Sequence, residues 1–403
     1  MFQINQQAVP YSDPWNTPLH ERIKTLARGK YRVAYFYESA NNSTFRYRAY
    51  NMVQVLNDEK NLDVSASYFF LDDLHMLEEI ADLADMLVIC RSRYCHKINR
   101  LITKFRVRGK RILFDVDDFV FNPAYTHLIM STLDQDNDNS GLWDYWFAYI
   151  SRMGETLRLC DGAITTNDYL ADRISEFSGL PVSVVPNFIN KEQLLLSESL
   201  FLNKKSSGFA RDGKICLGYF SGSPSHNLDY AVVTNALEEV LENDQRVEFM
   251  VVGYIDAGPS LNRFGSRIIR RPFQDYVNLQ RLVSSVEFNL MPLQSNIFTN
   301  CKSELKYFEA AIVGTLSIAS PSHTYSASIE DRKNGYIAQA HQWASVIQRA
   351  IENIDTYPDM AATANADAHL KYAWFNQRER ILKALAMDKA YLKIIDSVSE
   401  FSA

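Results

Sequence analysis

Short apolar runs alternate with amphipathic stretches along the first half of the chain. Runs of β-branched and aromatic residues predict buried strands, and apolar positions that repeat every three to four residues predict helices. The predicted strands cover residues 31–37, 62–70, 86–90, 112–114, 162–165 and 182–185. The predicted helices cover residues 19–27, 44–56, 72–83, 96–107, 142–159 and 169–177. This alternation predicts a mainly parallel sheet covered by helices.

The alternation restarts after a polar stretch, residues 190–212, which is predicted to be a linker. The second half predicts strands at residues 214–220, 247–252, 267–270, 287–291 and 316–319. It predicts helices at residues 228–241, 276–283 and 341–353, a helix that ends at Gly314, and a long final helical segment, 360–395. The sequence therefore predicts an α/β protein with two Rossmann-like halves of similar length.

Length and composition agree with this division. A chain of 403 residues exceeds the size at which single cores stop growing, about 250–300 residues. A net charge of −6 argues against a dedicated nucleic-acid binder. The five cysteines form no C-x-x-C pair, which argues against a disulfide framework or a structural zinc site. The sequence has neither a signal-peptide pattern nor a membrane-spanning run, so we expect a cytoplasmic protein.

Residues 298–320 carry the strongest candidate site. At a helical period, Lys302, Lys306 and Glu309 project together beside an apolar stripe, and Ser303 is a fair N-cap. Lysines and free backbone amides suit a diphosphate, and a carboxylate suits the two hydroxyls of a ribose. The alternative interpretation is an amphipathic helix with a solvated charged face.

The run from Glu309 to Ser320, EAAIVGTLSIAS, resembles the E-A-x-A-x-G-x-P-V-I-A-S signature of family 4 nucleotide-sugar glycosyltransferases. Residues 286–293 resemble the strand that precedes this signature in the family. The resemblance implies the two-domain GT-B architecture, in which two Rossmann-like domains face a cleft. It implies an acceptor domain at residues 1–190, a nucleotide-sugar donor domain at 191–373, and a final helix at 374–403 that crosses back to the first domain.

The resemblance also implies a reaction. A sugar would pass from a nucleoside-diphosphate sugar to a hydroxyl of a glycan or lipid-linked acceptor, with retention, without metal or another cofactor, in cell-surface polysaccharide synthesis. Lys302 and Lys306 would stabilise the leaving diphosphate. The family often has two glutamates separated by seven residues, of which Glu309 takes the second place; the first, which typically helps to hold the donor sugar, falls here on Cys301. The missing glutamate keeps open a protein that binds a sugar nucleotide or a partner protein without turnover. A sugar-nucleotide epimerase of related fold is a further alternative.

Two loops at strand ends are further candidates. Ser221, Gly222, Ser223 and His226 follow an apolar strand and match a G-Y-x-S-G-x-x-x-H pattern of part of the family, which implies contact with the donor diphosphate. The alternative is an ordinary strand-to-helix turn. Asn42, Arg46 and Arg48 follow the first strand and are candidates to close over the donor or hold an anionic acceptor. Their alternative is a solvated helix face.

Residues 112–119, ILFDVDDF, form the main competing signal. A strand that ends in D-x-D-D resembles the nucleophile motif of haloacid-dehalogenase-like phosphatases, with Asp115 as nucleophile and Asp117 as acid/base. Phe119 stands where that family has threonine, and the motif falls at the fourth strand. In the glycosyltransferase interpretation, Asp117 or Asp118 would orient a hydroxyl of the acceptor or the sugar.

Residues 91–111 are rich in lysine and arginine and contain no aspartate or glutamate. They are predicted either to dock on an anionic membrane surface that carries a lipid-linked acceptor, or to form a solvated basic face. The aromatic residues of the helix at 142–159 could reinforce an interface, but core packing or a contact between domains is the commoner role. The acidic stretch 134–139 lacks the glycine and glutamate of a calcium loop, so we predict no metal there.

Overall fold

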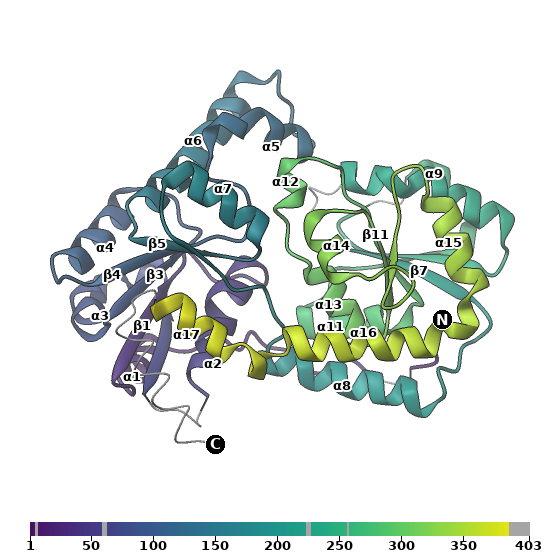
Figure 1. Ribbon diagram of the computed structural model, residues 1–403, viewed down its shortest axis with the longest axis horizontal. Coiled ribbons are helices and arrows are strands. Elements are labelled where there is room, and N and C mark those ends of the chain that lie inside the picture. The colour runs from purple at the N-terminus through teal and green to yellow at the C-terminus, as the bar shows by residue number, and fades with distance from the viewer. Residues whose placement is uncertain (5–6, 59–62, 223–226, 256–257, 387–403) are drawn as a thin grey trace. The chain divides into compact units, whose positions relative to one another are not determined.

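The computed structural model describes residues 1–4, 7–58, 63–222, 227–255 and 258–386. The chain divides into two compact units (Figure 1). Unit 1 comprises Met1–Asp13, Ala124–Ala148 and Ile189–Ala373, and unit 2 comprises Pro14–Pro123, Tyr149–Phe188 and the chain from Trp374. Two segments that precede the predicted boundary at residue 190 thus group with the unit that holds most of the second half.

Unit 2 is built on a six-stranded parallel sheet in the order β2-β1-β3-β4-β5-β6. Its strands are β1 Tyr31–Phe36, β2 Val64–Phe69, β3 Met86–Cys90, β4 Arg111–Asp115, β5 Gly162–Thr165 and β6 Val182–Val184. Its helices include α1 Leu19–Leu26, η1 Arg46–Tyr50, α2 Asn51–Leu56, η2 Leu71–Met76, α3 Leu77–Leu83, α4 His96–Arg106, α7 Asp168–Ser178, η7 Trp374–Asn376 and α17 Arg378–Ala386. Helix α6, Ser140–Arg158, has its later residues in this unit.

Unit 1 contains the second six-stranded parallel sheet, in the order β12-β11-β10-β7-β8-β9. Its strands are β7 Ile215–Ser221, β8 Val247–Gly253, β9 Ile268–Arg271, β10 Phe288–Met291, β11 Leu316–Ala319 and β12 Tyr336–Ile337. Its helices include α5 Thr126–Thr132, α8 Lys191–Ser206, α9 Asn227–Asn243, α10 Pro259–Asn262, α11 Tyr276–Ser285, α12 Ile297–Asn300, α13 Leu305–Ala311, α14 His323–Ser328, α15 Trp343–Glu352 and α16 Tyr357–Tyr372. Short 3₁₀ turns are η3 Pro123–Tyr125, η5 Gly265–Arg267 and η6 Ile354–Thr356.

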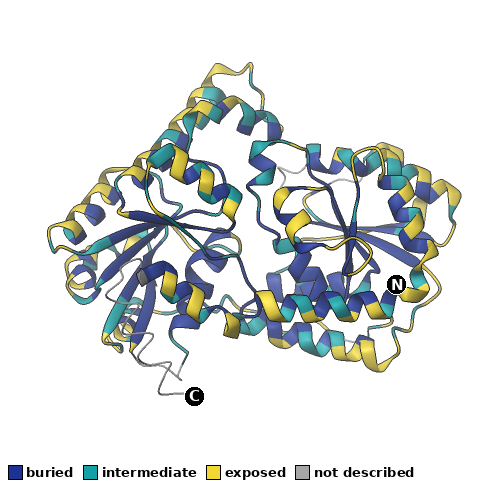
Figure 2. Ribbon diagram, in the orientation of Figure 1, coloured by how far each residue is buried: buried dark blue, intermediate teal, exposed yellow. Residues whose placement is uncertain are grey.

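Most strand residues of both sheets are buried, as Figure 2 shows, which explains why the strands read as apolar runs rather than as alternating patterns; the edge strands β6 and β9 are more exposed. Helices cover the sheets and expose only their outer faces (Figure 2). After α16 the chain returns to unit 2, where α17 packs beside α2. Arg378 anchors this return because its guanidinium donates to the carbonyl oxygens of Val55 and Leu56, both at 3.1 Å.

The predicted linker at residues 190–212 is wrong, because most of it forms helix α8. Asn190 caps this helix by accepting a hydrogen bond from the backbone of Gln193 at 2.9 Å. Leu194 and Leu196 are buried, whereas Leu195 between them is 74% exposed. Consecutive leucines leave no clear apolar stripe along the helix. The local pattern therefore concealed it, and packing in unit 1 stabilises it.

Candidate functional site

In the sheet of unit 1, the direction in which successive strands are added reverses between β7 and β10. From β7 the chain adds β8 and β9 on one side, then returns to place β10, β11 and β12 on the other. Parallel α/β sheets bind ligands at such a point, beside the carboxyl ends of the strands. We call this side of the sheet the carboxyl edge of unit 1.

Ser221 ends β7 at this edge and is 4% exposed, and Gly222 follows it at the surface. Gly253 ends the neighbouring β8 with a φ of +96°, and a Cβ there would lie 2.0 Å from the carbonyl oxygen of Ser221. Only glycine allows the two strand ends to approach this closely. Ser223 and His226, which the sequence assigns to the same loop, lie outside the described residues.

Lys306 lies on α13 near the β7 side of this edge. Its ammonium nitrogen is 4.9 Å from the ring centroid of Tyr219, a buried residue of β7. Burial lowers the pKa of Lys306 to about 8; the charge of Asp229 opposes this shift, and that of Lys302 adds to it. The lysine is thus held where a bound anion would restore the stability of its charged form.

Asp229 was not recognised from the sequence. It is 2% exposed in the first turn of α9, and its Oδ1 accepts hydrogen bonds from the backbone and side-chain nitrogens of Gln294, at 3.1 and 3.2 Å. Gln294 follows β10, so this pair connects the two sides of the switch point. No local motif marks Asp229, because its importance depends on the pairing of β7 with β10.

The prediction of one continuous helical face at residues 302–309 is wrong. The chain forms two short helices, α12 and α13, and Lys302 lies in the turn between them, with its ammonium 4.7 Å from the ring centroid of Phe298. Ser303 is not the N-cap. That position belongs to Glu304, and the Ser303 hydroxyl lies 3.5 Å from its carboxylate. Helix α12 ends after four residues, and the apolar stripe did not predict the turn that separates it from α13.

Glu309 lies on α13 as predicted, but it is 8% exposed rather than solvated. Its Oε1 accepts a hydrogen bond at 2.9 Å from the side chain of Gln193, a fully buried residue of α8. Gly314, with a φ of +64°, ends the helical region as the sequence predicted, and β11 follows. Cys301, where the resembled family often has a glutamate, is fully buried.

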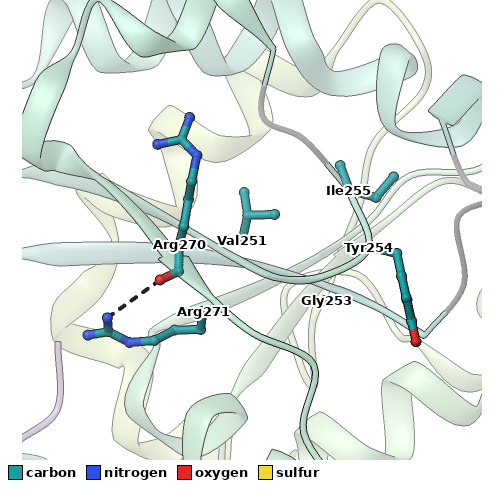
Figure 3. A pocket seen from close by; sticks show the side chains of 6 residues that line it. All are labelled: Val251, Gly253, Tyr254, Ile255, Arg270 and Arg271. Carbon is teal, nitrogen blue, oxygen red and sulfur yellow. Dashed lines mark hydrogen bonds between the residues drawn. The ribbon is translucent and has the colours of Figure 1, made fainter.

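A cavity of about 430 Å³ opens at the carboxyl ends of β8 and β9 (Figure 3). The lining residues are Val251, Gly253, Tyr254, Ile255, Arg270 and Arg271. Tyr254 is 55% exposed, and its ring centroid lies 5.4 Å from that of Phe273. Figure 3 shows Tyr254 and the two arginines at different sides of the cavity. The cavity therefore offers an aromatic surface and cationic groups to one ligand.

The sheet of unit 2 has its own switch point, between β1 and β3. Asp117 follows β4, the strand beside β3, and its Oδ2 accepts a hydrogen bond at 3.0 Å from the hydroxyl of Thr44, which follows β1. Arg91 follows β3, and one of its terminal nitrogens lies 3.0 Å from Asp117 Oδ1 and 3.3 Å from Asp118 Oδ2. The two aspartates predicted from the sequence thus share one arginine, which sequence reasoning did not single out.

Asp115 is not available as a phosphatase nucleophile. Arg48 donates from Nε and a terminal nitrogen to its two carboxylate oxygens, at 2.6 and 3.0 Å, and both side chains are completely buried. Burial raises the pKa of Asp115 to about 6, against the opposing charge of Arg48. Because a guanidinium occupies both oxygens away from solvent, the carboxylate cannot attack a phosphorus atom.

The predicted cleft role of the arginines after the first strand is also wrong. Arg48 belongs to the buried pair with Asp115. Arg46 is 4% exposed, its Nε donates to the carbonyl oxygen of Asn42 at 2.9 Å, and its guanidinium lies 4.0 Å from the ring centroid of Tyr47. Arg46 therefore stabilises the loop after β1, and Arg48 holds the end of β4, so both arginines have structural roles.

The basic stretch at residues 91–111 is partly neutralised by acidic residues of α3. Arg108 pairs with Asp82 at 2.6 Å and with Glu78 at 2.9 Å, and Lys104 also pairs with Glu78. These acidic partners are distant in the sequence, so the stretch looked more cationic than the surface that it forms. Among the described residues, no helix combines the length and apolar character needed to cross a bilayer.

The aromatic segment of α6 is largely at the surface of unit 1. Tyr145 is 56% exposed and Phe147 is 41% exposed. Trp143 stacks on Phe147 with ring centroids 5.2 Å apart and an interplanar angle of 12°. Tyr145 and Phe147 are therefore not core residues of unit 1.

No family model matches the sequence, and no curated protein matches it. Solved structures do match. HepE of Anabaena, in complex with UDP and glucose, is 12% identical with a TM-score of 0.59, over 88% of this chain and 99% of HepE. Sucrose-phosphate synthase of Thermosynechococcus elongatus is 12% identical with a TM-score of 0.56, over 91% of this chain and 99% of that chain. A glycosyltransferase of Rickettsia africae is 14% identical with a TM-score of 0.56, over 90% and 99%. The two parallel sheets and these similarities identify the fold of the chain as GT-B.

Proposed function

We propose that the protein is a glycosyltransferase that moves a sugar from a nucleoside-diphosphate sugar to an acceptor hydroxyl. The observation that carries the proposal is Lys306, a lysine with a lowered pKa whose ammonium lies 4.9 Å from the ring centroid of Tyr219 on β7, at the switch point of unit 1. The GT-B fold supports it, because HepE of Anabaena has been solved with UDP and with UDP-glucose.

The donor nucleotide would bind along the carboxyl edge of unit 1. Lys302 and Lys306 would contact the diphosphate, and Glu309 would accept hydrogen bonds from the ribose hydroxyls. The nucleotide base would bind in the cavity beside Tyr254, because the ring of Tyr254 can stack on the base. Its lining arginines, Arg270 and Arg271, add positive charge near the phosphates.

The chemical step needs a stabilised leaving group and a positioned acceptor. Cationic side chains near the diphosphate favour the charge that develops when the glycosidic bond to phosphate breaks. Asp117 or Asp118 of unit 2 would orient a hydroxyl of the acceptor or the sugar by accepting its hydrogen bond. We propose that the sugar is transferred with retention to a glycan or lipid-linked acceptor and that the reaction needs no metal or other cofactor.

Cys301 gives one specific reason to keep a second candidate. A fully buried thiol stands where the resembled family often has a carboxylate that holds the donor sugar. A protein with this site could bind the nucleotide without transferring the sugar. Nucleotide binding with and without release of UDP separates the two functions.

The test combines calorimetry with an activity assay. UDP and UDP-glucose are titrated into the wild-type protein, and release of UDP from UDP-glucose is followed with and without candidate acceptor glycans. Lys306→Met should weaken UDP binding about tenfold or more, because hydrogen bonds to charged groups contribute about 1.5–3 kcal/mol. Lys333→Met is the matched control, since Lys333 is an exposed lysine of the same unit paired with Glu330 at 2.7 Å.

The outcomes distinguish the candidates. Acceptor-dependent release of UDP supports transfer. Tight binding without release supports the non-catalytic binding protein. If UDP does not bind, or if Lys306→Met and Lys333→Met bind it equally well, the assignment of the donor site is wrong.

A further inference from the structure

Arg91 has an unusual backbone for a residue that is not glycine. Its φ is +32°, in the region that side chains with a Cβ rarely adopt. Its backbone N–H donates to the carbonyl oxygen of Asp115 at 2.8 Å, which continues the pairing of β3 with β4 beyond the last strand residue. Strained residues of this kind persist where the surroundings hold them, often at functional sites.

The strained backbone directs the Arg91 guanidinium to the carboxyl edge of unit 2. A single terminal nitrogen, NH1, lies 3.1 Å from the Thr44 hydroxyl oxygen, 3.0 Å from Asp117 Oδ1 and 3.3 Å from Asp118 Oδ2. The Thr44 hydroxyl accepts from Arg91 and donates to Asp117 Oδ2 at 3.0 Å. Each oxygen of the Asp117 carboxylate therefore has one fixed donor from the protein.

This cluster joins the loops that follow three different strands of the sheet. Thr44 follows β1, Arg91 follows β3 and Asp117 follows β4, so the cluster spans the switch point between β1 and β3. Its side chains remain within reach of solvent, with 19% of Arg91, 13% of Asp117 and 23% of Asp118 exposed. A ligand can therefore reach the aspartates here, unlike the completely buried Asp115.

We infer that Arg91 is a positioning residue that holds the Asp117 carboxylate correctly oriented to accept a hydrogen bond from a substrate hydroxyl. An ionised carboxylate has about four acceptor positions, so those that Arg91 and Thr44 leave can serve a ligand. The same cation offsets the repulsion between Asp117 and Asp118, which follow each other in the chain. The inference rests on the proposed function, because it gives Asp117 a hydroxyl to orient.

The test uses the full-length protein with UDP-glucose as donor and release of UDP as the readout, in water alone and with each candidate acceptor glycan. Arg91→Gln should lower kcat about tenfold to a hundredfold, because a misoriented carboxylate loses its positioning effect. UDP affinity, measured by calorimetry, should stay within about twofold, because the proposed nucleotide contacts all belong to unit 1. Arg91→Lys should recover most of the loss, since one nitrogen makes all three contacts and an ammonium has three donors.

Arg32→Gln is the matched control. Arg32 also pairs with an aspartate of unit 2, Asp85, through contacts of 3.0 and 3.1 Å. This pair lies at the amino ends of β1 and β3, whereas Thr44 and Arg91 follow the carboxyl ends of these strands. Substitution of Arg32 should leave kcat and UDP affinity unchanged. Melting temperatures of all three variants report whether they fold.

The outcomes separate this inference from the proposed function. If wild-type protein releases UDP and Arg91→Gln releases it as fast as Arg32→Gln, only the role of Arg91 is wrong. If Arg91→Lys is as slow as Arg91→Gln with both proteins folded, the positive charge does not position Asp117. If both Arg91 variants fail to fold while Arg32→Gln does, Arg91 is structural and the inference is also wrong. If wild-type protein binds UDP but releases none from UDP-glucose, either in water alone or with any of the candidate acceptor glycans, the transferase proposal fails, and this inference fails with it.

Discussion

The charge of Lys306 is expected to make nucleotide binding weaken as the pH rises from 7 to 9. Burial disfavours its ammonium and lowers the pKa to about 8; nearby Asp229 opposes the shift, Lys302 adds to it and Glu309 opposes it. A bound diphosphate favours the charged form, so binding raises the pKa of Lys306. The sign follows directly: above pH 8 the free protein has already lost the proton that the complex needs, and binding must take it up from solvent.

The size of the effect follows from the same pKa. About nine in ten Lys306 side chains are charged at pH 7 and about one in ten at pH 9. If only the charged form binds the diphosphate, the affinity for UDP falls about tenfold between these two pH values. The second ionisation of a phosphate monoester has its midpoint near pH 6, so the terminal phosphate of UDP is already mostly ionised at pH 7 and its charge changes little over this range.

Calorimetric titration of UDP at pH 7, 8 and 9 measures this dependence. Buffers with different ionisation enthalpies also report proton uptake, which should be greatest at the higher pH values. Lys306→Arg is the informative variant, because arginine stays charged throughout and should remove the dependence. Equal affinity of wild-type protein at pH 7 and pH 9, or the same loss in Lys306→Arg, would refute the role given to this lysine.

Two further substitutions test other parts of the structure. Glu309→Gln should lower UDP affinity about tenfold to a hundredfold, because a neutral amide is a weaker acceptor than a carboxylate. It should also cost about 1 kcal/mol of stability by weakening the buried bond to Gln193, which urea unfolding measures; unchanged UDP affinity would contradict the ribose assignment. Arg48→Met should cost about 3–5 kcal/mol in the same unfolding assay, because it leaves Asp115 buried without its partner. Adding Asp115→Leu should recover much of that loss, and a single variant as stable as wild type would contradict the structural role of the pair.

The amino-acid sequence determined the class of the fold through its local patterns. Strands of a parallel sheet are buried on both faces, so they appear as apolar runs that need no knowledge of their neighbours. The strands predicted at residues 86–90 and 287–291 are accordingly close to β3 and β10. Gly314 ended its helix as predicted, because the positive φ at that position depends on local geometry.

Tertiary packing determined where several helices begin and end and which of their side chains are buried. Residues 191–206 form a helix because unit 1 buries Leu194, Leu196 and Leu200, although no apolar stripe marks them. Lys302 left the predicted helical face because the chain turns between α12 and α13. Glu309 lies on the predicted helix, but α8 covers it, and a helical pattern cannot predict which neighbour packs on a charged position.

The polar clusters depend on the order of strands in each sheet. Arg48 and Asp115 look like surface and catalytic residues in the sequence, and they become a buried pair only when the segments after β1 and at the end of β4 meet. Arg91 meets Thr44 and Asp117 for the same reason. Local periodicity specifies where strands begin and end but not which strands are neighbours, because strand order is set by the packing of the whole unit. The sequence therefore pointed to the aspartates, and the tertiary structure determined which of them solvent can reach.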